Sequence, residues 1–304
     1  MNCYAGLDLG GTALKYGYGN NKSGLLFFER KLHHNQGKEE VFKLLTAAIH
    51  DIKNRLQKDE ILRAIALGSP GYIDVRKGEV LYNSPNLKDW TSAKPCKILE
   101  KAFSVPVFIE NDANLMAYGE AKTRGSNSDS CLGITIGTGI GSGFVLNDRI
   151  YHGDSYSAME IGHTIIRNKG RRCGCGKYGC LEMYSSVSAI KKQAARLLPE
   201  PFEMEDLLSL QNSDERIRSI INQAYDKLGF AIANAVTLLD PRLVIIGGGL
   251  TECKSFSLSQ LIPCITQYLN NYQINNLKIE QASLKNRAGV WGGILRAESL
   301  YSGQ

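Results

Sequence analysis

The sequence contains no run of five lysines and arginines, no apolar run of 18 residues and no low-complexity segment. The missing apolar run excludes a helical membrane span, because crossing a bilayer takes about 20 mostly apolar residues. The missing charge block argues against a nucleic-acid-binding tail. The first residues, Met-Asn-Cys-Tyr-Ala-Gly, show no basic region followed by an apolar stretch, so we expect no signal peptide.

Two binding signatures are also missing. No Gly-x4-Gly-Lys-Ser/Thr occurs, which excludes P-loop chemistry. The paired Cys-x2-Cys knuckles of a zinc-ribbon nucleic-acid binder do not occur either. The densest basic stretch contains Arg167, Lys169, Arg171, Arg172 and Lys177. We interpret this stretch as a solvated loop, with a nucleic-acid patch as the weaker alternative.

The composition is that of an ordinary soluble globular protein. The chain has 304 residues, of which 43% are hydrophobic and 22% charged, and its length predicts roughly two domains of about 150 residues. The net charge of +6 bears on solubility and anion attraction, not on the fold. Three of the eight cysteines are clustered and the others are scattered singly, which fits a reducing cytoplasm.

The strongest pattern combines three clustered cysteines with a histidine ten residues upstream: His163, Cys173, Cys175 and Cys180. Imidazole and thiolate ligands select zinc, and four of them complete a closed, structural tetrahedral site. The glycines at 174, 176 and 179 suit the tight turns that would aim three sulfurs at one point. The alternative is three unrelated reduced thiols on a loop. The zinc site would draw together the two carboxylates that flank it, Glu160 and Glu182.

Two predicted pairs of strands, 3–9 with 13–19 and 131–137 with 142–147, are joined by glycine-threonine turns. The turns contain Gly10, Gly11 and Thr12 in the first pair and Thr138, Gly139 and Gly141 in the second. Backbone amides in such turns can hold phosphate oxygens, and Asp8 could face a bound metal ion. An ordinary hairpin is the alternative for the first turn. The second turn is not a dinucleotide fingerprint, because a strand follows it instead of a helix.

Three further predicted strands end in residues suited to a binding site. Strand 61–67 leads into Gly68-Ser69-Pro70-Gly71, strand 105–109 leads to Asn111 and Asp112, and strand 243–246 leads to Gly247, Gly248 and Gly249. Ligands of open α/β sheets collect at strand ends, and the three glycines let a flat ligand approach the backbone. Asp112 is either the N-cap of the next helix or a proton acceptor held at the mouth of the sheet.

Apolar spacing predicts the remaining elements. A third strand is expected at 25–32 and a last strand at 277–281. Helices are expected at 38–57, 92–103, from 115, at 183–197, 214–239 and 256–270, and from 287.

The metal motif carries a resemblance. Glu-x-Gly-His followed by Cys-x-Cys-Gly-x-x-Gly-Cys-x-Glu resembles the signature of the ROK family, which comprises sugar kinases and sugar-responsive repressors. The resemblance implies a two-domain actin-like ATPase (ribonuclease H-like) α/β fold with an interdomain cleft. The smaller lobe would comprise 1–114 and 287–304, and the larger lobe 115–286.

The resemblance also assigns roles to residues. Asp112 would be the general base, and the sugar would be bound by Gly71, Asn86, Asn111, Glu160, His163 and Glu182. ATP and Mg²⁺ would be bound by Asp8, Gly10, Gly11, Thr12, Lys15, Thr138, Gly139, Gly141, Gly247, Gly248 and Gly249. His163 would serve twice, with one ring nitrogen on zinc and the other on the sugar.

The expected activity is ATP-dependent phosphorylation of a hexose, with glucose as the first choice and glucose 6-phosphate as the product. N-acetylmannosamine, other N-acetylhexosamines and fructose are the alternatives. A non-catalytic sugar-sensing member of the family is the alternative of a different class. Because the first strand begins at Cys3, we expect no helix-turn-helix ahead of it. We expect a cytoplasmic homodimer that binds neither membrane nor nucleic acid.

Overall fold

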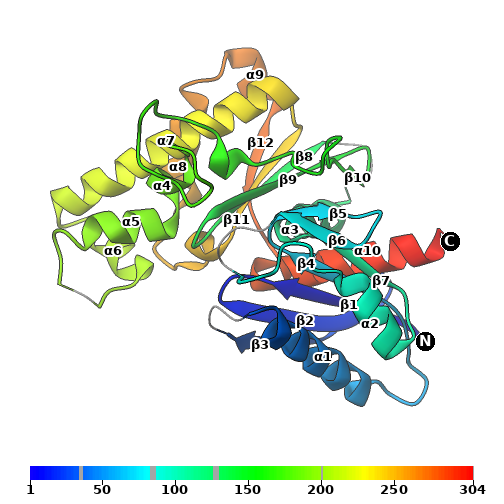
Figure 1. The fold of residues 1–304 in the computed structure, drawn as a ribbon. Helices are drawn as coiled ribbons and strands as arrows, with labels where there is room; N and C mark the ends of the chain where they lie inside the picture. The colour runs from blue at the N-terminus through cyan, green and yellow to red at the C-terminus, as the bar shows by residue number, and fades with distance from the viewer. Residues whose placement is uncertain (34–36, 83–86, 126–129, 200, 304) are drawn as a thin grey trace. The chain divides into compact units, whose positions relative to one another are not determined.

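The computed structural model describes residues 1–33, 37–82, 87–125, 130–199 and 201–303. The chain forms two compact α/β units (Figure 1). The first unit consists of Met1–Gly125, Ile150–Ala158 and Asn286–Gln304, and the second of Ser126–Arg149 and Met159–Lys285. The predicted α/β class is therefore confirmed.

The first unit extends beyond the expected boundary at 114. Helix α3 (Asp112–Thr123) packs against α10 (Ala288–Ser302) and against the strands β4 (Ile61–Ser69) and β7 (Val107–Asn111). Because these contacts hold α3 in the first unit, the chain leaves this unit only after Gly125.

The first unit contains a five-stranded sheet with the order β3-β2-β1-β4-β7. Strands β1, β2 and β3 are antiparallel neighbours, whereas β4 and β7 run parallel to β1. Besides β4 and β7, its strands are β1 (Asn2–Leu9), β2 (Ala13–Asn20) and β3 (Gly24–Leu32). The expected strands are all present.

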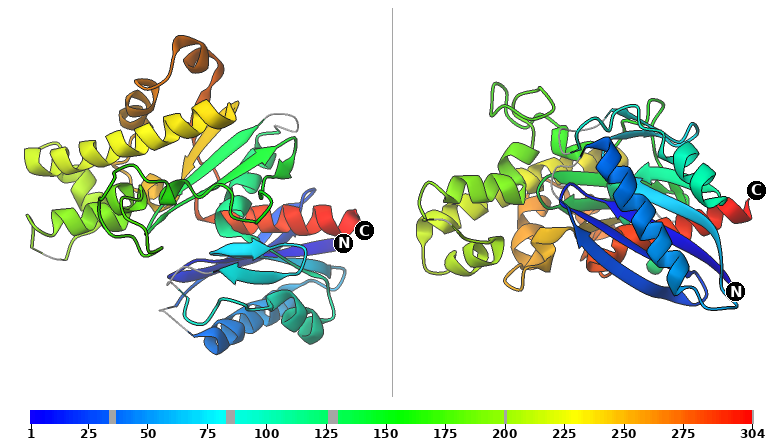
Figure 2. Two further views of the ribbon diagram at one scale, coloured as in Figure 1. Left: turned by 45° about the horizontal axis from the view of Figure 1, so that its top comes forward. Right: turned by 60° about the horizontal axis from the view of Figure 1, so that its bottom comes forward.

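Helices cover both faces of this sheet (Figure 2). Ala5, Leu7 and Leu9 of β1 share an apolar core with α1 (Lys38–Arg55) and α2 (Pro95–Phe103). The alternate residue Tyr4 packs with Val290 and Ile294 of α10 on the opposite face. Since side chains alternate along a strand, Asp8 points to the α10 face.

The second unit repeats this arrangement. Its sheet has the order β10-β9-β8-β11-β12, with an antiparallel β8–β9 hairpin and parallel β11 and β12. Its strands are β8 (Cys131–Ile136), β9 (Ile140–Leu146), β10 (Arg149–Ile150), β11 (Leu243–Gly247) and β12 (Lys278–Gln281). Both sheets thus open with a hairpin and continue with parallel strands, which confirms the predicted internal repeat.

A buried core joins this sheet to the long helix α7 (Glu215–Leu239) through apolar residues such as Ile221, Leu228 and Ile232. The other helices of the second unit are α4 (Glu182–Ser185), α5 (Val187–Ala194), α6 (Met204–Leu210), α8 (Leu258–Thr266) and α9 (Asn271–Asn276). Short 3-10 turns occur at η1 (Ile161–His163), η2 (Gly249–Glu252) and η3 (Lys285–Arg287).

Two predicted helices are wrong in extent. The helix expected at 183–197 is interrupted at Ser186, whose backbone is extended. The side-chain hydroxyl of Ser186 accepts from the amide of Ala189 at 3.1 Å and thereby caps α5. The helix expected at 256–270 spans only Leu258–Thr266, and the separate helix α9 begins after its N-cap Asn270. The helices and strands missed altogether are α6, α9, β10 and the hairpin of β5 (Tyr72–Asp74) and β6 (Glu79–Tyr82).

Within the described part of the chain, no helix combines the length and the apolar character that a membrane crossing requires.

Candidate functional site

The strand ends of the first sheet align two carboxylates. Asp8 lies near the end of β1, opposite Lys15 in β2 and beside Gly68 in β4. Gly68 in turn pairs with Glu110 of β7, two residues before Asp112. The buried Asp8 carboxylate is bound by Lys15, whose Nζ lies 3.0 Å from Oδ2. The register of three strands therefore places Asp8 and Asp112 at the same edge of the sheet.

Asp112 has an environment suited to proton transfer. Burial and, secondarily, the negative charge of Asp8 raise the pKa of Asp112 to about 6. The positive charge of Lys15 and the amide of Ala113, which donates to Asp112 Oδ1 at 3.0 Å, act in the opposite direction. A carboxyl group that titrates near the working pH is a suitable general base.

Asn111, and not Asp112, is the N-cap of α3, so the alternative that made Asp112 the cap is wrong. Asn111 Oδ1 accepts from the amides of Ala113 at 2.9 Å and Asn114 at 3.1 Å. Its Nδ2 donates to the carbonyl oxygen of Gly71 at 3.1 Å. The structure thus brings Asn111 and Gly71 together, whereas Asn86 lies outside the described residues.

The first glycine-threonine turn closes the β1–β2 hairpin, with the amide of Gly10 donating to the Ala13 carbonyl at 3.0 Å. Gly11 is half-buried and Thr12 is exposed. The buried His33 was not predicted to take part. Its Nε2 lies 2.9 Å from the Gly10 carbonyl, which can only accept, so this nitrogen carries the proton. No motif around His33 indicates this contact.

Gly289 at the start of α10 was also missed. A Cβ placed there would lie 2.7 Å from Cγ of Asp8. Only glycine therefore lets α10 begin directly against this carboxylate. The contact joins residues far apart in the sequence and could not be predicted from either segment alone.

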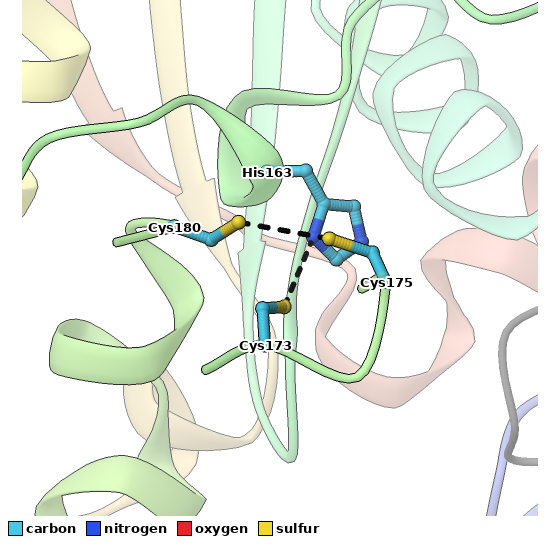
Figure 3. Close-up of side chains that lie close together, drawn as sticks. All are labelled: His163, Cys173, Cys175 and Cys180. Atoms are coloured by element: carbon cyan, nitrogen blue, oxygen red, sulfur yellow. Dashed lines mark hydrogen bonds between the residues drawn. The ribbon is translucent and has the colours of Figure 1, made fainter. Parts of the chain in front are cut away.

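In the second unit, His163, Cys173, Cys175 and Cys180 converge (Figure 3). Their candidate ligand atoms all lie within 4.8 Å of one another. Cys173 Sγ is 3.6 Å from His163 Nδ1, and Cys175 Sγ is 3.6 Å from Cys180 Sγ. Ligand atoms around a tetrahedral zinc ion are separated by about 3.5–3.8 Å, given the usual Zn–S and Zn–N distances. The four side chains therefore fit a zinc ion.

The loop that carries the cysteines depends on two of its glycines. Gly176 and Gly179 have φ values of 88° and 82°, in the left-handed region. A Cβ on Gly179 would lie 1.8 Å from the Arg167 carbonyl oxygen, so a side chain cannot be accommodated there. A hydrogen bond from the Cys173 amide to the Lys177 carbonyl, at 2.8 Å, closes the turn between the cysteines.

His163 presents its two ring nitrogens to different neighbours. Nδ1 faces Cys173 in the cluster, whereas Nε2 lies 4.0 Å from Oε2 of Glu160. His163 is the last residue of the 3-10 turn η1, and Glu160 is the N-cap of this turn. The metal cluster thus lies beside Glu160, with the histidine between them.

Glu182 lies against the second glycine-threonine turn. Its Oε2 accepts from the amide of Ile140 at 2.9 Å. A Cβ on Gly139 would lie 2.3 Å from the same oxygen, so the turn and the carboxylate are in close contact. Thr138 is exposed at the tip of this turn, and Gly141 pairs with Thr135 across the hairpin.

The end of β11 lies next to the same hairpin. Gly247 pairs with Thr135 of β8, and Gly248 has a φ of 89°. A Cβ on Gly248 would lie 2.5 Å from the amide nitrogen of Ile136, whereas a Cβ on Gly249 would meet nothing within 4 Å. The structure therefore brings the second turn and the three glycines together within one unit.

Comparisons with known proteins agree with this geometry. The model of the ROK family matches residues 4–299. A glucokinase of Halalkalibacterium halodurans is 33% identical over 313 residues, covering 95% of this chain and 93% of the relative. A xylose repressor of Caldicellulosiruptor bescii is 32% identical. The match covers 95% of this chain and 76% of the repressor.

The structure also resembles that of a ROK family glucokinase from Streptomyces griseus in complex with glucose and AMPPNP. The TM-score is 0.86, the sequence identity is 25%, and the match covers 98% of this chain and 99% of the other. The expected actin-like ATPase fold, with its two related α/β units, is thereby confirmed.

Proposed function

This chain belongs to the ROK family, and we propose that it is an ATP-dependent sugar kinase that phosphorylates a hexose. The observation that carries the proposal is the pair of carboxylates at one sheet edge. Asp8 is held by Lys15, and Asp112 has its pKa raised to about 6. A carboxylate paired with a lysine, beside another whose pKa is raised, provides a cation ligand and a base.

Asp112 accepts the proton of the attacking sugar hydroxyl. As that O–H bond breaks, the hydroxyl oxygen forms a bond to the γ-phosphorus of ATP, and the bond to the β,γ-bridging oxygen breaks to release ADP. Phosphoryl transfer requires mainly positioning and charge stabilisation from the protein. Asp8 would hold Mg²⁺, which supplies charge neutralisation when bound.

The two glycine-threonine turns bind phosphate oxygens through backbone amides. In the first unit these are the amides of Gly11 and Thr12, next to Gly10, whose own amide closes the hairpin, with Lys15 nearby as a counter-charge to phosphate. In the second unit they are Thr138, Gly139 and Gly141. Gly247, Gly248 and Gly249 bind the adenosine, since the open face of Gly249 leaves its backbone accessible to a flat ring.

The sugar is bound by short polar groups that match a ring of hydroxyls. These are the residues around Gly71 and Asn111 together with Asn86, Glu160, His163 and Glu182. The hydrogen bond between Asn111 and Gly71 supports a shared role for these two. Glucose is the first choice of substrate, in agreement with the glucokinase among the relatives. N-acetylmannosamine, other N-acetylhexosamines and fructose are the alternatives.

His163, Cys173, Cys175 and Cys180 would hold a structural zinc ion, which supplies a fixed orientation for the imidazole and no reaction step. With Nδ1 on the metal side, Nε2 remains available to a sugar hydroxyl. The zinc site therefore serves sugar recognition.

A panel of hexoses assayed by ADP release tests the proposal. We expect turnover with one hexose and a loss of about 10²–10⁴-fold in kcat for Asp112→Asn, the usual range for a general base. Asp226→Asn, on the helix α7 of the second unit, is the matched control and should retain full activity. Retained turnover in Asp112→Asn would contradict the base assignment, and no turnover with any sugar would contradict the kinase itself.

A non-catalytic sugar sensor is the second candidate, since the xylose repressor from Caldicellulosiruptor bescii is 32% identical. This candidate predicts sugar binding by calorimetry without ADP release. The predicted homodimer is a separate expectation, which analytical ultracentrifugation measures directly.

A further inference from the structure

Glu110 is a buried carboxylate that the proposed reaction does not use. It is the residue of β7 two positions before Asp112, and only 3% of its surface is exposed. Its Oε1 accepts from the backbone amide of Asn111 at 2.9 Å and from Nδ2 of Asn114 at 3.0 Å. One oxygen of Glu110 thus holds two groups of the turn that carries Asp112.

The other oxygen of Glu110 is bound by a residue far away in sequence. His152 Nε2 lies 2.7 Å from Glu110 Oε2. A carboxylate oxygen accepts, so the histidine nitrogen donates and carries the proton. His152 is half-buried, and its ring lies edge-on to Tyr156 at 6.0 Å. It belongs to Ile150–Ala158, the segment of the first unit that leads along the chain to Glu160.

We propose that His152 is a positioning residue for Asp112, acting through Glu110. This inference rests on the proposed kinase function. The N–H of His152 fixes Oε2, and Glu110 in turn fixes the amide of Asn111 and the side chain of Asn114. These contacts set where the first turn of α3 begins and therefore where the Asp112 carboxylate points.

The energetic reason is the cost of a buried carboxylate without its donors. Removing the His152 N–H leaves one Glu110 oxygen in the interior without that partner, which favours a shift of the side chain towards another donor or water. Any such shift moves the strand-to-helix turn. A displacement of about 1 Å at a reacting group can lower a rate by about 100-fold.

Two variants separate the hydrogen bond from the packing of the ring. His152→Gln keeps an N–H donor at nearly the position of Nε2, whereas His152→Leu keeps apolar bulk and removes the donor. We expect kcat to fall by about 10- to 100-fold in His152→Leu and to stay within about threefold of wild type in His152→Gln. The KM for ATP should change little in both, because Gly247, Gly248 and Gly249 lie in the other unit and the contacts of His152 and Glu110 run to Asn111 and Asn114, which are not assigned to ATP.

Amide hydrogen exchange of the peptide Val107–Tyr118 is measured on the same proteins. Faster exchange in His152→Leu alone supports the inference independently of turnover. Three results would overturn it: full kcat in His152→Leu, an equal loss of kcat in both variants, or a loss of kcat accompanied by a rise in the KM for ATP. If the wild-type chain phosphorylates no sugar, the proposed kinase function fails. In that case, equal amide exchange in His152→Leu and wild type would show that His152 does not hold the turn before α3.

Discussion

Single residues decide whether a carboxylate can act as a base. Asp8 lies near the end of β1 and Asp112 directly follows β7 of the same sheet, yet of the two only Asp8 has a lysine nitrogen at 3.0 Å. Asp112 is half-buried, and its desolvation together with the negative charge of Asp8 raises its pKa to about 6. The two side chains are of the same type, so the difference between their environments comes from their neighbours.

The pH dependence of the reaction should report this environment. Protonated Asp112 cannot accept a proton, so kcat/KM is expected to fall as the pH drops below about 6. Lys15→Met removes a positive charge that lowers the pKa of Asp112, so the acidic limb should move to higher pH. The exposed Lys22→Met is the control. An acidic limb at the same pH in Lys15→Met and wild type would contradict this electrostatic coupling.

Stability should depend on Asp112 in the opposite sense from activity. A carboxyl group whose folded pKa is raised contributes its stability below the unfolded value of 3.8, and that contribution is lost as the pH rises through about 6. Asp112→Asn cannot ionise, so we expect it to exceed wild type by about 1–3 kcal/mol at pH 8. The difference should shrink towards pH 4. Urea unfolding at the two pH values measures it, and an equal difference at both would argue against a raised pKa.

At the scale of elements, the end of β11 places two adjacent glycines in different surroundings. Gly248 has a φ of 89° and no room for a Cβ beside Ile136, whereas Gly249 faces open space. The first glycine is therefore required by the fold. The second is available for a ligand that approaches the backbone closely.

Alanine substitutions test this distinction. Gly248→Ala should lower the free energy of unfolding by more than about 1 kcal/mol, because its backbone conformation is strained for a side chain and the Cβ meets a backbone nitrogen. Gly249→Ala should leave stability within about 0.5 kcal/mol and weaken ATP binding instead. Thermal unfolding and calorimetric titration with a non-hydrolysable ATP analogue measure the two effects. Unchanged nucleotide affinity in Gly249→Ala would contradict the adenosine assignment.

At the scale of the whole molecule, each unit has its own sheet and its own buried core, and the metal cluster belongs to the second unit alone. A structural zinc ion stabilises the segment that supplies its ligands. Its loss should therefore act first on that part of the chain.

Metal removal provides the test. Cys180→Ser should lose the one zinc ion per chain that we expect by elemental analysis, whereas Cys264→Ser, outside the cluster, should retain it. In Cys180→Ser, amide exchange should rise in residues 160–185 and remain unchanged in β1 and β4. Sugar affinity should fall before ATP affinity does, because His163 is oriented by the metal. Normal sugar phosphorylation by the zinc-free variant would contradict the role of zinc in recognition.

Much of this architecture could be predicted from the sequence, because the signals were local. The alternation of Ala5, Leu7 and Leu9 and the apolar stripe of α7 depend only on the period of a strand and of a helix. The glycine-threonine turn at Thr138, between two predicted strands, likewise predicted the second hairpin from a short segment. The convergence of His163, Cys173, Cys175 and Cys180 could be predicted because the three cysteines lie within eight residues and turns bring them together.

Only the tertiary structure could decide the contacts between distant segments. Asn111 caps α3 and also donates to the Gly71 carbonyl, and Glu182 accepts from the Ile140 amide beside the Gly139 turn. Chain connectivity says nothing of such pairs, since each depends on strand register and on the packing of elements far apart in sequence.

The sequence by itself thus determined the elements, the repeat and the cysteine-histidine cluster, since each depends on spacing within a short segment. The tertiary structure decided which side chains meet at the edge of the first sheet. Asp8, the Glu110–Asp112 turn and His152 come from three separate stretches of chain. Their burial and charge, which set the pKa of Asp112, exist only once those stretches are packed together.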